Sequence, residues 1–285
     1  MLNWSAIIGE LQQAGGDASG QPDPTPVRGG DISSAWRIGN LFVKTGPPAS
    51  ADMFSAEAEG LAELAGSGAV RVPELVACGV QGDTAYLATT WIEFGSTSGK
   101  VAAKLGEQLA ALHATTAARF GWHRDNTIGL TPQINDWSDD WVGFFRRHRL
   151  GFQLRLAADK GFGGALQRDG QRLLQSLDRF FDDYTPQPAL LHGDLWGGNW
   201  GACGGEPVIF DPAVYYGDRE SDLAMTRLFG GFGREFYAAY EAAAPLAAGH
   251  RERCDLYQLY HVLNHLNLFG GGYLRQAQNL MQRLL

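Results

Sequence analysis

The stretch His192-Gly193-Asp194-Leu195-Trp196-Gly197-Gly198-Asn199 decides the fold. It follows the short apolar run PALL (188–191), which is typical of a buried strand. Asp194 and Asn199 lie five positions apart, so one loop carries both a carboxylate and an amide. Twelve residues beyond Asn199, Asp211 directly follows another apolar, strand-like run. A carboxylate at the end of a buried strand is well placed to bind Mg²⁺, which prefers oxygen ligands.

The catalytic loop of protein kinases has the same spacing, in the pattern H-R-D-x-x-x-x-N. By this pattern Asp194 is the expected catalytic base, and Asn199 and Asp211 are the expected metal ligands. A solvated acidic turn would explain HGD alone. It does not explain the asparagine, the flanking apolar runs and the second aspartate together. The constellation therefore predicts a phosphoryl-transfer site that uses ATP and Mg²⁺.

Lys44 ends the apolar run LFVK (41–44) and is the second expected catalytic residue. A strand lysine in this position contacts the α- and β-phosphates of ATP in kinases and pairs with a helix glutamate. Taken alone, it would be an ordinary solvated edge residue. Glu57 and Glu59 are the two candidate partners on a helix predicted over 51–65. Because side chains two positions apart diverge on a helix, only one of them can face Lys44.

A glycine-containing loop, GGDISS (29–34), precedes this strand. It matches neither G-x-G-x-x-G nor the P-loop pattern. The backbone N–H groups of Gly29 and Gly30 and the hydroxyls of Ser33 and Ser34 are candidates to cover the phosphates of ATP. An ordinary turn into a hairpin explains the loop equally well.

Hydrophobic periodicity divides the chain into a β-rich part and a helical part. After a helix of about ten residues at the N-terminus, strands are expected on both sides of Gly39-Asn40 and at 70–76 and 84–92. Amphipathic helices follow, at about 101–117, 138–157, 171–184, 221–229, 232–243 and 252–284. We therefore expect an α+β, two-lobed, protein-kinase-like fold. Residues 1–92 would form a small antiparallel-sheet lobe with one helix that binds ATP, and residues 93–285 a larger, mainly helical catalytic and substrate lobe.

Composition excludes several classes of protein. The 285 residues are 45% hydrophobic, which excludes disorder as the main state. A net charge of −8 disfavours nucleic acid as a partner, and no apolar run is long enough to span a membrane. The N-terminus lacks the features of a signal peptide. Cys78, Cys203 and Cys254 are widely spaced, which favours a reducing cytoplasm over a disulfide framework. We expect a cytoplasmic monomer or weak dimer.

Several longer stretches resemble the fructosamine kinase, or ketosamine-3-kinase, family. The resemblance rests on 192–199, on FDPAVYYGDRESDLAMTRLFGGF (210–232) and on YQLYHVLNHLNLFGGGY (257–273). The mid-chain pattern NTIG-x-x-PQIN-x-W-x-DDW-x-x-FF-x-x-HRL (126–150) and MFSAEAEGLAEL (53–64) are also similar to that family. The similarity implies an aminoglycoside-kinase-like fold. It also implies transfer of the γ-phosphoryl group of ATP to the 3-hydroxyl of a sugar-derived ketoamine. The unstable product then releases the free amine, which is a form of deglycation.

The resemblance also implies roles for single residues. It supports Asp194 as the base, and it favours Glu57 over Glu59 as the partner of Lys44. Asp222 is expected to brace the catalytic loop without taking part in the chemistry. Asp31 occupies a position where some relatives carry a cysteine, so thiol regulation is not expected there. The adenine-binding hinge would fall on three consecutive residues, Thr90, Trp91 and Ile92.

The expected substrate residues are Trp196, His265, Asp218, Arg219 and Glu220. An aromatic face is a common platform for a sugar or a cationic amine, although Trp196 could equally be a core residue. Asp218, Arg219 and Glu220 closely follow Asp211, one of the expected metal ligands, and could line the acceptor cleft. A surface turn is the favoured explanation for these three charged residues. His261 and His265 lie four apart on a helix, but the glutamate of H-E-x-x-H is missing, so a core or cleft-lining pair is favoured over a zinc site.

Two alternatives remain beside the ketoamine kinase. A kinase for an aminoglycoside, choline or another alcohol would share the catalytic loop, but it should lack the pattern at 126–150. A catalytically inactive nucleotide-binding module is disfavoured by the intact Lys44, Asp194, Asn199 and Asp211. The residues leave open whether the ketoamine derives from fructose, ribulose or erythrulose. They also leave open whether its amine is free or belongs to a protein lysine.

Overall fold

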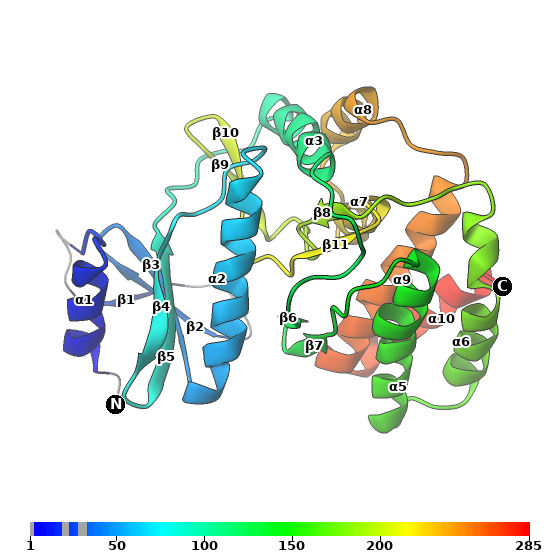
Figure 1. Cartoon of the computed structure of the whole chain (residues 1–285), viewed down its shortest axis with the longest axis horizontal. Helices are drawn as coiled ribbons and strands as arrows, with labels where there is room; N and C mark the ends of the chain where they lie inside the picture. The colour runs from blue at the N-terminus through cyan, green and yellow to red at the C-terminus, as the bar shows by residue number, and fades with distance from the viewer. Residues whose placement is uncertain (1–2, 19–22, 28–32) are drawn as a thin grey trace.

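The computed structural model describes residues 3–18, 23–27 and 33–285. Figure 1 shows a small lobe, in which a sheet is flanked by two helices, beside a larger and mostly helical lobe. The α+β, two-lobed fold expected from the sequence is therefore confirmed. Among the described ranges, none of the helices combines the length and apolar character needed to cross a bilayer.

The small lobe is built on an antiparallel sheet with the strand order β1-β2-β3-β5-β4. Its strands are β1 (Thr25–Val27), β2 (Ser34–Ile38), β3 (Leu41–Gly46), β4 (Leu75–Gln81) and β5 (Thr84–Thr90). The predicted hairpin at Gly39-Asn40 joins β2 to β3, and Gly39 adopts a φ of 57° in this turn. The flanking helices are α1 (Trp4–Gln13) and α2 (Ala51–Gly66).

The alternation of side chains along β3 aims Lys44 at the interior of the molecule. Leu41 and Val43 are buried on one face of the sheet, where they pack with Ile7 and Leu11 of α1. Because successive residues of a strand point to opposite faces, Lys44 projects from the other face. That face is covered by the first turns of α2, whose Phe54 and Ala58 pack on Ala85 and Leu87 of β5.

The larger lobe consists of helices around three two-stranded antiparallel sheets. Its helices are α3 (Gly99–His113), α4 (Trp141–Phe144), α5 (Gly151–Asp159), α6 (Ala165–Gln175), α7 (Glu220–Leu228), α8 (Arg234–Ala243), α9 (His250–Phe269) and α10 (Leu274–Arg283). The strands pair as β6 (Asn126–Ile128) with β7 (Thr131–Gln133), β8 (Ala189–Leu191) with β11 (Tyr215–Gly217), and β9 (Trp200–Cys203) with β10 (Glu206–Ile209). Leu61 and Leu64 of α2 join the apolar core of this lobe.

The structure corrects two of the predicted elements. The strand expected at 70–76 starts only at Leu75; before it, the chain makes a single bridge in which the backbone carbonyl of Arg71 accepts a hydrogen bond from the N–H of Ile209. The helix expected over 138–157 is interrupted by a π-helical turn over Phe145–Leu150, between α4 and α5. This wider turn buries Arg149, which donates to the carbonyl oxygen of Ile134 and to Asn135 Oδ1.

His261 is buried in the middle of α9, with 1% of its surface exposed. Among the described residues its Nδ1 has no hydrogen-bond partner. Burial, with the nearby His265, lowers the pKa of His261 to about 3, because the charged imidazolium cannot be hydrated there. The described residues contain no group of three or more His, Cys, Asp or Glu side chains that could hold a metal.

We predict that His261 makes the protein less stable in mild acid. In the unfolded chain the imidazole takes up a proton near its usual pKa of 6.5, whereas the folded state resists protonation down to about pH 3. The unfolded state therefore binds more protons in this window, and stability falls by about 1.4 kcal/mol per pH unit below 6.5. Urea unfolding of His261→Leu should show a shallower decline between pH 7 and pH 5 than the wild type. Equal slopes would contradict the assignment; His250→Gln, at the partly exposed start of α9, is the control.

Candidate active site

The predicted catalytic loop lies between β8 and β9. At Gly193 the backbone has a φ of 82°, a value that side-chain-bearing residues rarely adopt. A Cβ atom built there would lie 2.0 Å from the carbonyl oxygen of Ala213. Glycine is therefore required between His192 and Asp194, which explains the sequence HGD.

Asp222 of α7 fixes the backbone of this loop, as expected. Its carboxylate accepts hydrogen bonds from the N–H groups of His192 (2.7 Å) and Gly193 (2.8 Å). The Nε2 of His113 lies 3.2 Å from the same carboxylate, and its Nδ1 lies 2.8 Å from the hydroxyl of Tyr240. Burial would raise the pKa of Asp222, but these hydrogen bonds and the neighbouring imidazoles lower it. Asp222 is thus a buried, ionised anchor.

His192 links the catalytic loop to the segment that carries Asp211. The carbonyl oxygen of Phe210 lies 2.9 Å from its Nε2, and the N–H of Asp194 lies 3.2 Å from its Nδ1. A carbonyl can only accept and an N–H can only donate, so this network assigns the proton to Nε2. Burial lowers the pKa of His192, which keeps the imidazole neutral as this arrangement requires.

The side chain of Asn199 brings the three predicted residues together. Its Nδ2 donates to the backbone carbonyl oxygens of Asp194 (2.9 Å) and Asp211 (3.4 Å). With the NH₂ group engaged, Oδ1 is the side-chain atom that can bind a cation. Asp211 has a φ of 56°, which puts a non-glycine residue in the left-handed region. Such backbone strain is common at functional sites.

Lys44 joins the two lobes through a pair of carboxylates. Its Nζ lies 2.7 Å from Oε1 of Glu57 and 2.8 Å from Oδ1 of Asp211. The choice between the two glutamates is thereby resolved, because Glu59 bonds to His123 and Arg124 on another side of α2. Burial would lower the pKa of Lys44, but the two carboxylates outweigh it and raise the pKa above its ordinary value. Burial raises the pKa of Glu57 despite the opposing pull of Lys44.

A cleft of about 660 Å³ opens between the lobes, and Lys44, Glu57, Asp194, Asn199 and Asp211 all line it. Burial, reinforced by the negative charges of Asp211 and Asp222, raises the pKa of Asp194 to about 7. A carboxyl group with a pKa near neutrality is suited to accept a proton from a hydroxyl at physiological pH.

Asn199 and Asp211 fit a magnesium ion that also binds phosphate. They offer one amide oxygen and one carboxylate on adjoining backbone. Mg²⁺ is typically held by one or two carboxylates together with substrate phosphates and water, so a cage of protein ligands is not needed. The donor set matches that pattern, and Lys44 beside it supplies further positive charge.

The predicted nucleotide residues border the same cleft. Thr90 at the end of β5 lines it together with Trp91 and Ile92, and Ser33 lines it just before β2. The N–H of Thr90 donates to the carbonyl of Glu74, and that of Trp91 to the carbonyl of Asn40. These two N–H groups are therefore used within the protein. Ser34 is exposed in β2, and Gly29 and Gly30 lie outside the described residues.

Trp196 and His265 line the cleft opposite the small lobe. Trp196 is 39% exposed, which excludes a core position, and its ring lies 6.1 Å from that of Phe229. A Cβ at position 198 would lie 2.3 Å from this indole, so Gly198 makes room for it. His265 donates from Nδ1 to the carbonyl of His261 and packs against Phe229.

Asp218, Arg219 and Glu220 do not line the cleft, which corrects the expectation that they contact the acceptor. Asp218 is fully buried and accepts hydrogen bonds from the hydroxyls of Tyr184 (2.8 Å) and Tyr257 (2.5 Å). Glu220 forms a buried ion pair with Arg253. Arg219 donates to the backbone carbonyls of residues 244 and 245. All three therefore hold the start of α7, which carries Asp222.

Phe94, Asn264 and Phe269 are among the cleft-lining residues that the sequence patterns missed. Phe94 lies just after the lobe boundary predicted at residue 92, and its ring lies 5.2 Å from that of Phe210. Asn264 directly precedes His265 on α9. No motif gave a signal for Phe94, whereas Asn264 could have been found from its neighbour.

The chain is 43% identical to a "Probable ketoamine kinase" of Synechocystis sp., over 99% of this chain and 97% of that protein. It is also 43% identical to a chloroplastic "Protein-ribulosamine 3-kinase" of Arabidopsis thaliana, over 91% of this chain and 81% of that protein.

Solved structures show the same fold. A "Putative fructosamine-3-kinase" from Haemophilus somnus superimposes with a TM-score of 0.90 at 28% identity, over 99% of this chain and 97% of that one. The aminoglycoside phosphotransferase APH(2'')-IIa, in a complex with streptomycin and ATP, has a TM-score of 0.65 at 14% identity, over 99% of this chain and 97% of that one, and shows the fold alone. The fructosamine kinase family model matches residues 3–285. The family model covers nearly the whole chain, and one cleft is lined by Lys44, Asp194, Asn199 and Asp211. This chain therefore belongs to the fructosamine kinase family.

Proposed function

We propose that this chain is an ATP-dependent kinase that phosphorylates the 3-hydroxyl of sugar-derived ketoamines, the first step of deglycation. The observation that carries the proposal is the side chain of Asn199. It holds the backbone of Asp194 and Asp211 together within one cleft, beside the Lys44 ammonium from the other lobe. The relatives named as ketoamine and ribulosamine kinases support the same acceptor class.

In the proposed mechanism, Asp194 orients the acceptor hydroxyl and takes its proton as the oxygen attacks the γ-phosphorus. The bond from the γ-phosphorus to the bridging oxygen breaks, and ADP leaves. Lys44 stabilises negative charge on the phosphates, while Glu57 keeps its ammonium in place. Asn199 and Asp211 would hold Mg²⁺, which neutralises the phosphate oxygens when bound. Most of the rate would come from positioning and electrostatic stabilisation, as phosphoryl transfer generally requires.

We further propose that Thr90, Trp91, Ile92, Gly29, Gly30, Ser33 and Ser34 contact the nucleotide, and that Trp196 and His265 contact the ketoamine. On this proposal the division near residue 92 separates an ATP-binding lobe from a catalytic and substrate lobe. The net charge of −8 supports a small-molecule or protein-bound ketoamine rather than a nucleic acid as partner. A cytoplasmic monomer or weak dimer completes the proposal.

An ADP-release screen tests the function directly. Fructose-, ribulose- and erythrulose-derived ketoamines, on free amines and on protein lysines, should support ADP release in the presence of ATP and Mg²⁺. Aminoglycosides and choline serve as controls for the alternative alcohol kinases. ADP release only with those controls would reject the ketoamine assignment. ATP binding without turnover of any acceptor would favour an inactive nucleotide-binding module.

We predict that Asp194→Asn lowers kcat by at least about 10²-fold, the usual size of a general-base contribution. An amide cannot take the hydroxyl proton, but it occupies nearly the same volume, so ATP affinity and Tm should change little. Steady-state kinetics and nucleotide titration measure the two quantities. Asp139→Asn, which alters an exposed carboxylate, is the matched control. Wild-type turnover by the Asp194 variant would remove the base assignment.

We predict that Trp196→Ala raises KM for the ketoamine by roughly twofold to tenfold, as expected for the loss of an aromatic contact worth about 0.5–1.5 kcal/mol. KM for ATP should stay within twofold, about the resolution of such comparisons. Trp137→Ala is a matched control, because Trp137 is also 39% exposed but does not line the cleft. An unchanged ketoamine KM would show that Trp196 does not contact the acceptor.

A further inference from the structure

Helix α2 carries Glu57, the partner of Lys44, and its opposite side is held by the larger lobe. Asp52, Glu59 and Glu63 lie seven and four residues apart along α2. At about 100° per residue these three carboxylates form one stripe, roughly 20–40° wide. Glu57 projects about 120–160° away from the three carboxylates of that stripe. A rotation of α2 about its axis would therefore move Glu57 relative to Lys44.

Arg124 lies just before β6 in the larger lobe and forms ion pairs with two carboxylates of this stripe. Its Nη2 donates to Oδ1 of Asp52 (2.5 Å) and to the carbonyl oxygen of Asp52 (3.4 Å). Its Nη1 donates to Glu59 and to the hydroxyl of Ser55 (3.2 Å). The planar guanidinium thus spans two turns of α2, which a lysine ammonium could not do. Arg124 itself is only 22% exposed.

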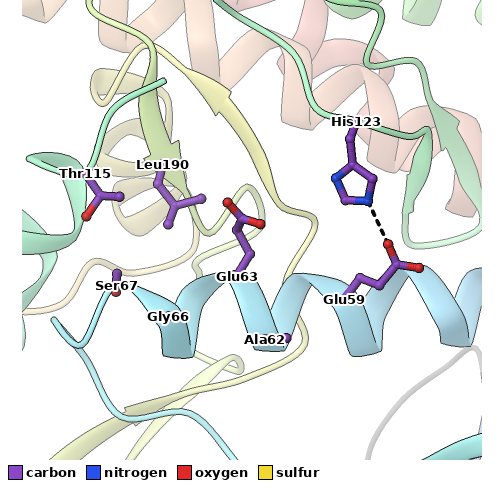
Figure 2. A pocket seen from close by; sticks show the side chains of 8 residues that line it. All are labelled: Glu59, Ala62, Glu63, Gly66, Ser67, Thr115, His123 and Leu190. Carbon is purple, nitrogen blue, oxygen red and sulfur yellow. Dashed lines mark hydrogen bonds and ion pairs between the residues drawn. The ribbon is translucent and has the colours of Figure 1, made fainter. Parts of the chain in front are cut away.

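Two neighbours extend the contact along the helix. His123 Nε2 lies 2.7 Å from Oε2 of Glu59, and Tyr216 donates to Oε1 of Glu63 at 2.6 Å. Figure 2 shows the His123–Glu59 bond and Glu63 on the side of α2 that faces Thr115 and Leu190. Partial burial would raise the pKa of Glu59, but hydrogen bonds from His123 and Arg124 lower it, so this carboxylate is ionised.

Apolar packing is interrupted along this side of α2. A pocket of about 510 Å³ lies between the helix and the larger lobe (Figure 2), lined by Glu59, Ala62, Glu63, Gly66, Ser67, Thr115, His123 and Leu190. Leu61 and Leu64 anchor the C-terminal half of α2 in the core of the larger lobe. The turns around Glu57 instead pack on the sheet of their own lobe, through Phe54 and Ala58. The polar contacts of Arg124 tie these turns to the larger lobe.

We propose that Arg124 is a positioning residue that fixes the rotation of α2 and thereby keeps Glu57 against Lys44. In kinases the pairing of this lysine with the helix glutamate is a condition for phosphoryl transfer, and the position of the helix controls it. Here the contacts of Arg124 with Asp52, Ser55 and Glu59 keep Glu57 paired with Lys44 within a single chain. The proposal rests on the proposed kinase function and assigns a residue that acts on the ATP side of the reaction.

A double-mutant cycle tests this proposal. Arg124→Ala should lower kcat/KM for ATP by about tenfold, while KM for the ketoamine stays within twofold, because the acceptor side is not touched. In a Glu57→Gln background, Arg124→Ala should cost less than about twofold, since the pair that it positions is already lost. Arg124→Lys should recover part of the loss. The control is Arg119→Ala, which breaks contacts to Asp139 and to the carbonyl of Trp137 without reaching α2.

Equal losses in the two backgrounds, or Arg124→Ala kinetics like those of Arg119→Ala, would overturn the proposal. Tm and an ATP-analogue titration without acceptor accompany each variant, so nucleotide affinity is measured even if the acceptor assignment is wrong. Absence of turnover in the wild type would instead reject the proposed function. If Arg124→Ala does not fold, Glu59→Gln removes one charged partner of Arg124 and leaves the contacts with Asp52 and Ser55. It should give a smaller loss with the same split between ATP and ketoamine kinetics.

Discussion

The geometry of the cleft depends on one buried cation, the ammonium of Lys44, placed between Glu57 and Asp211. A charge removed from water needs compensating partners, and here these come from α2 and from the segment after β10. The same ion triad therefore links the two lobes at the cleft. Its members are separated by up to 167 residues in the chain, so the tertiary fold assembles it.

A second buried charge plays the corresponding part inside the larger lobe. Asp222 accepts hydrogen bonds from two backbone N–H groups of the predicted catalytic loop. The His192 side chain links this loop to the segment of Asp211 through the carbonyl oxygen of Phe210. The residues once expected to contact substrate, Asp218 and Glu220, stabilise the helix start from which Asp222 projects. The predicted catalytic loop is thus positioned by ionised and hydrogen-bonded side chains that do not themselves line the cleft.

Much of this site could be predicted because its signals are local. The spacing from Asp194 to Asn199, the strand before Asp211 and the strand that carries Lys44 each lie within a short window of sequence. The pairing of Lys44 with Glu57 needed the structure, since spacing alone left Glu59 equally possible. The roles of Asp218 and Glu220 depend on Tyr184, Tyr257 and Arg253, which come from remote segments. Helical periodicity does not reveal the π-helical turn at 145–150, in which Arg149 is buried.

The left-handed backbone at Asp211 limits how this site can change in evolution. Glycine, asparagine and aspartate tolerate that conformation best, and among them only aspartate is charged. A glutamate would restore the charge but would have to adopt a backbone angle that it disfavours. Natural variation at this position therefore has few intermediate choices: it keeps aspartate, or it gives up the negative charge altogether.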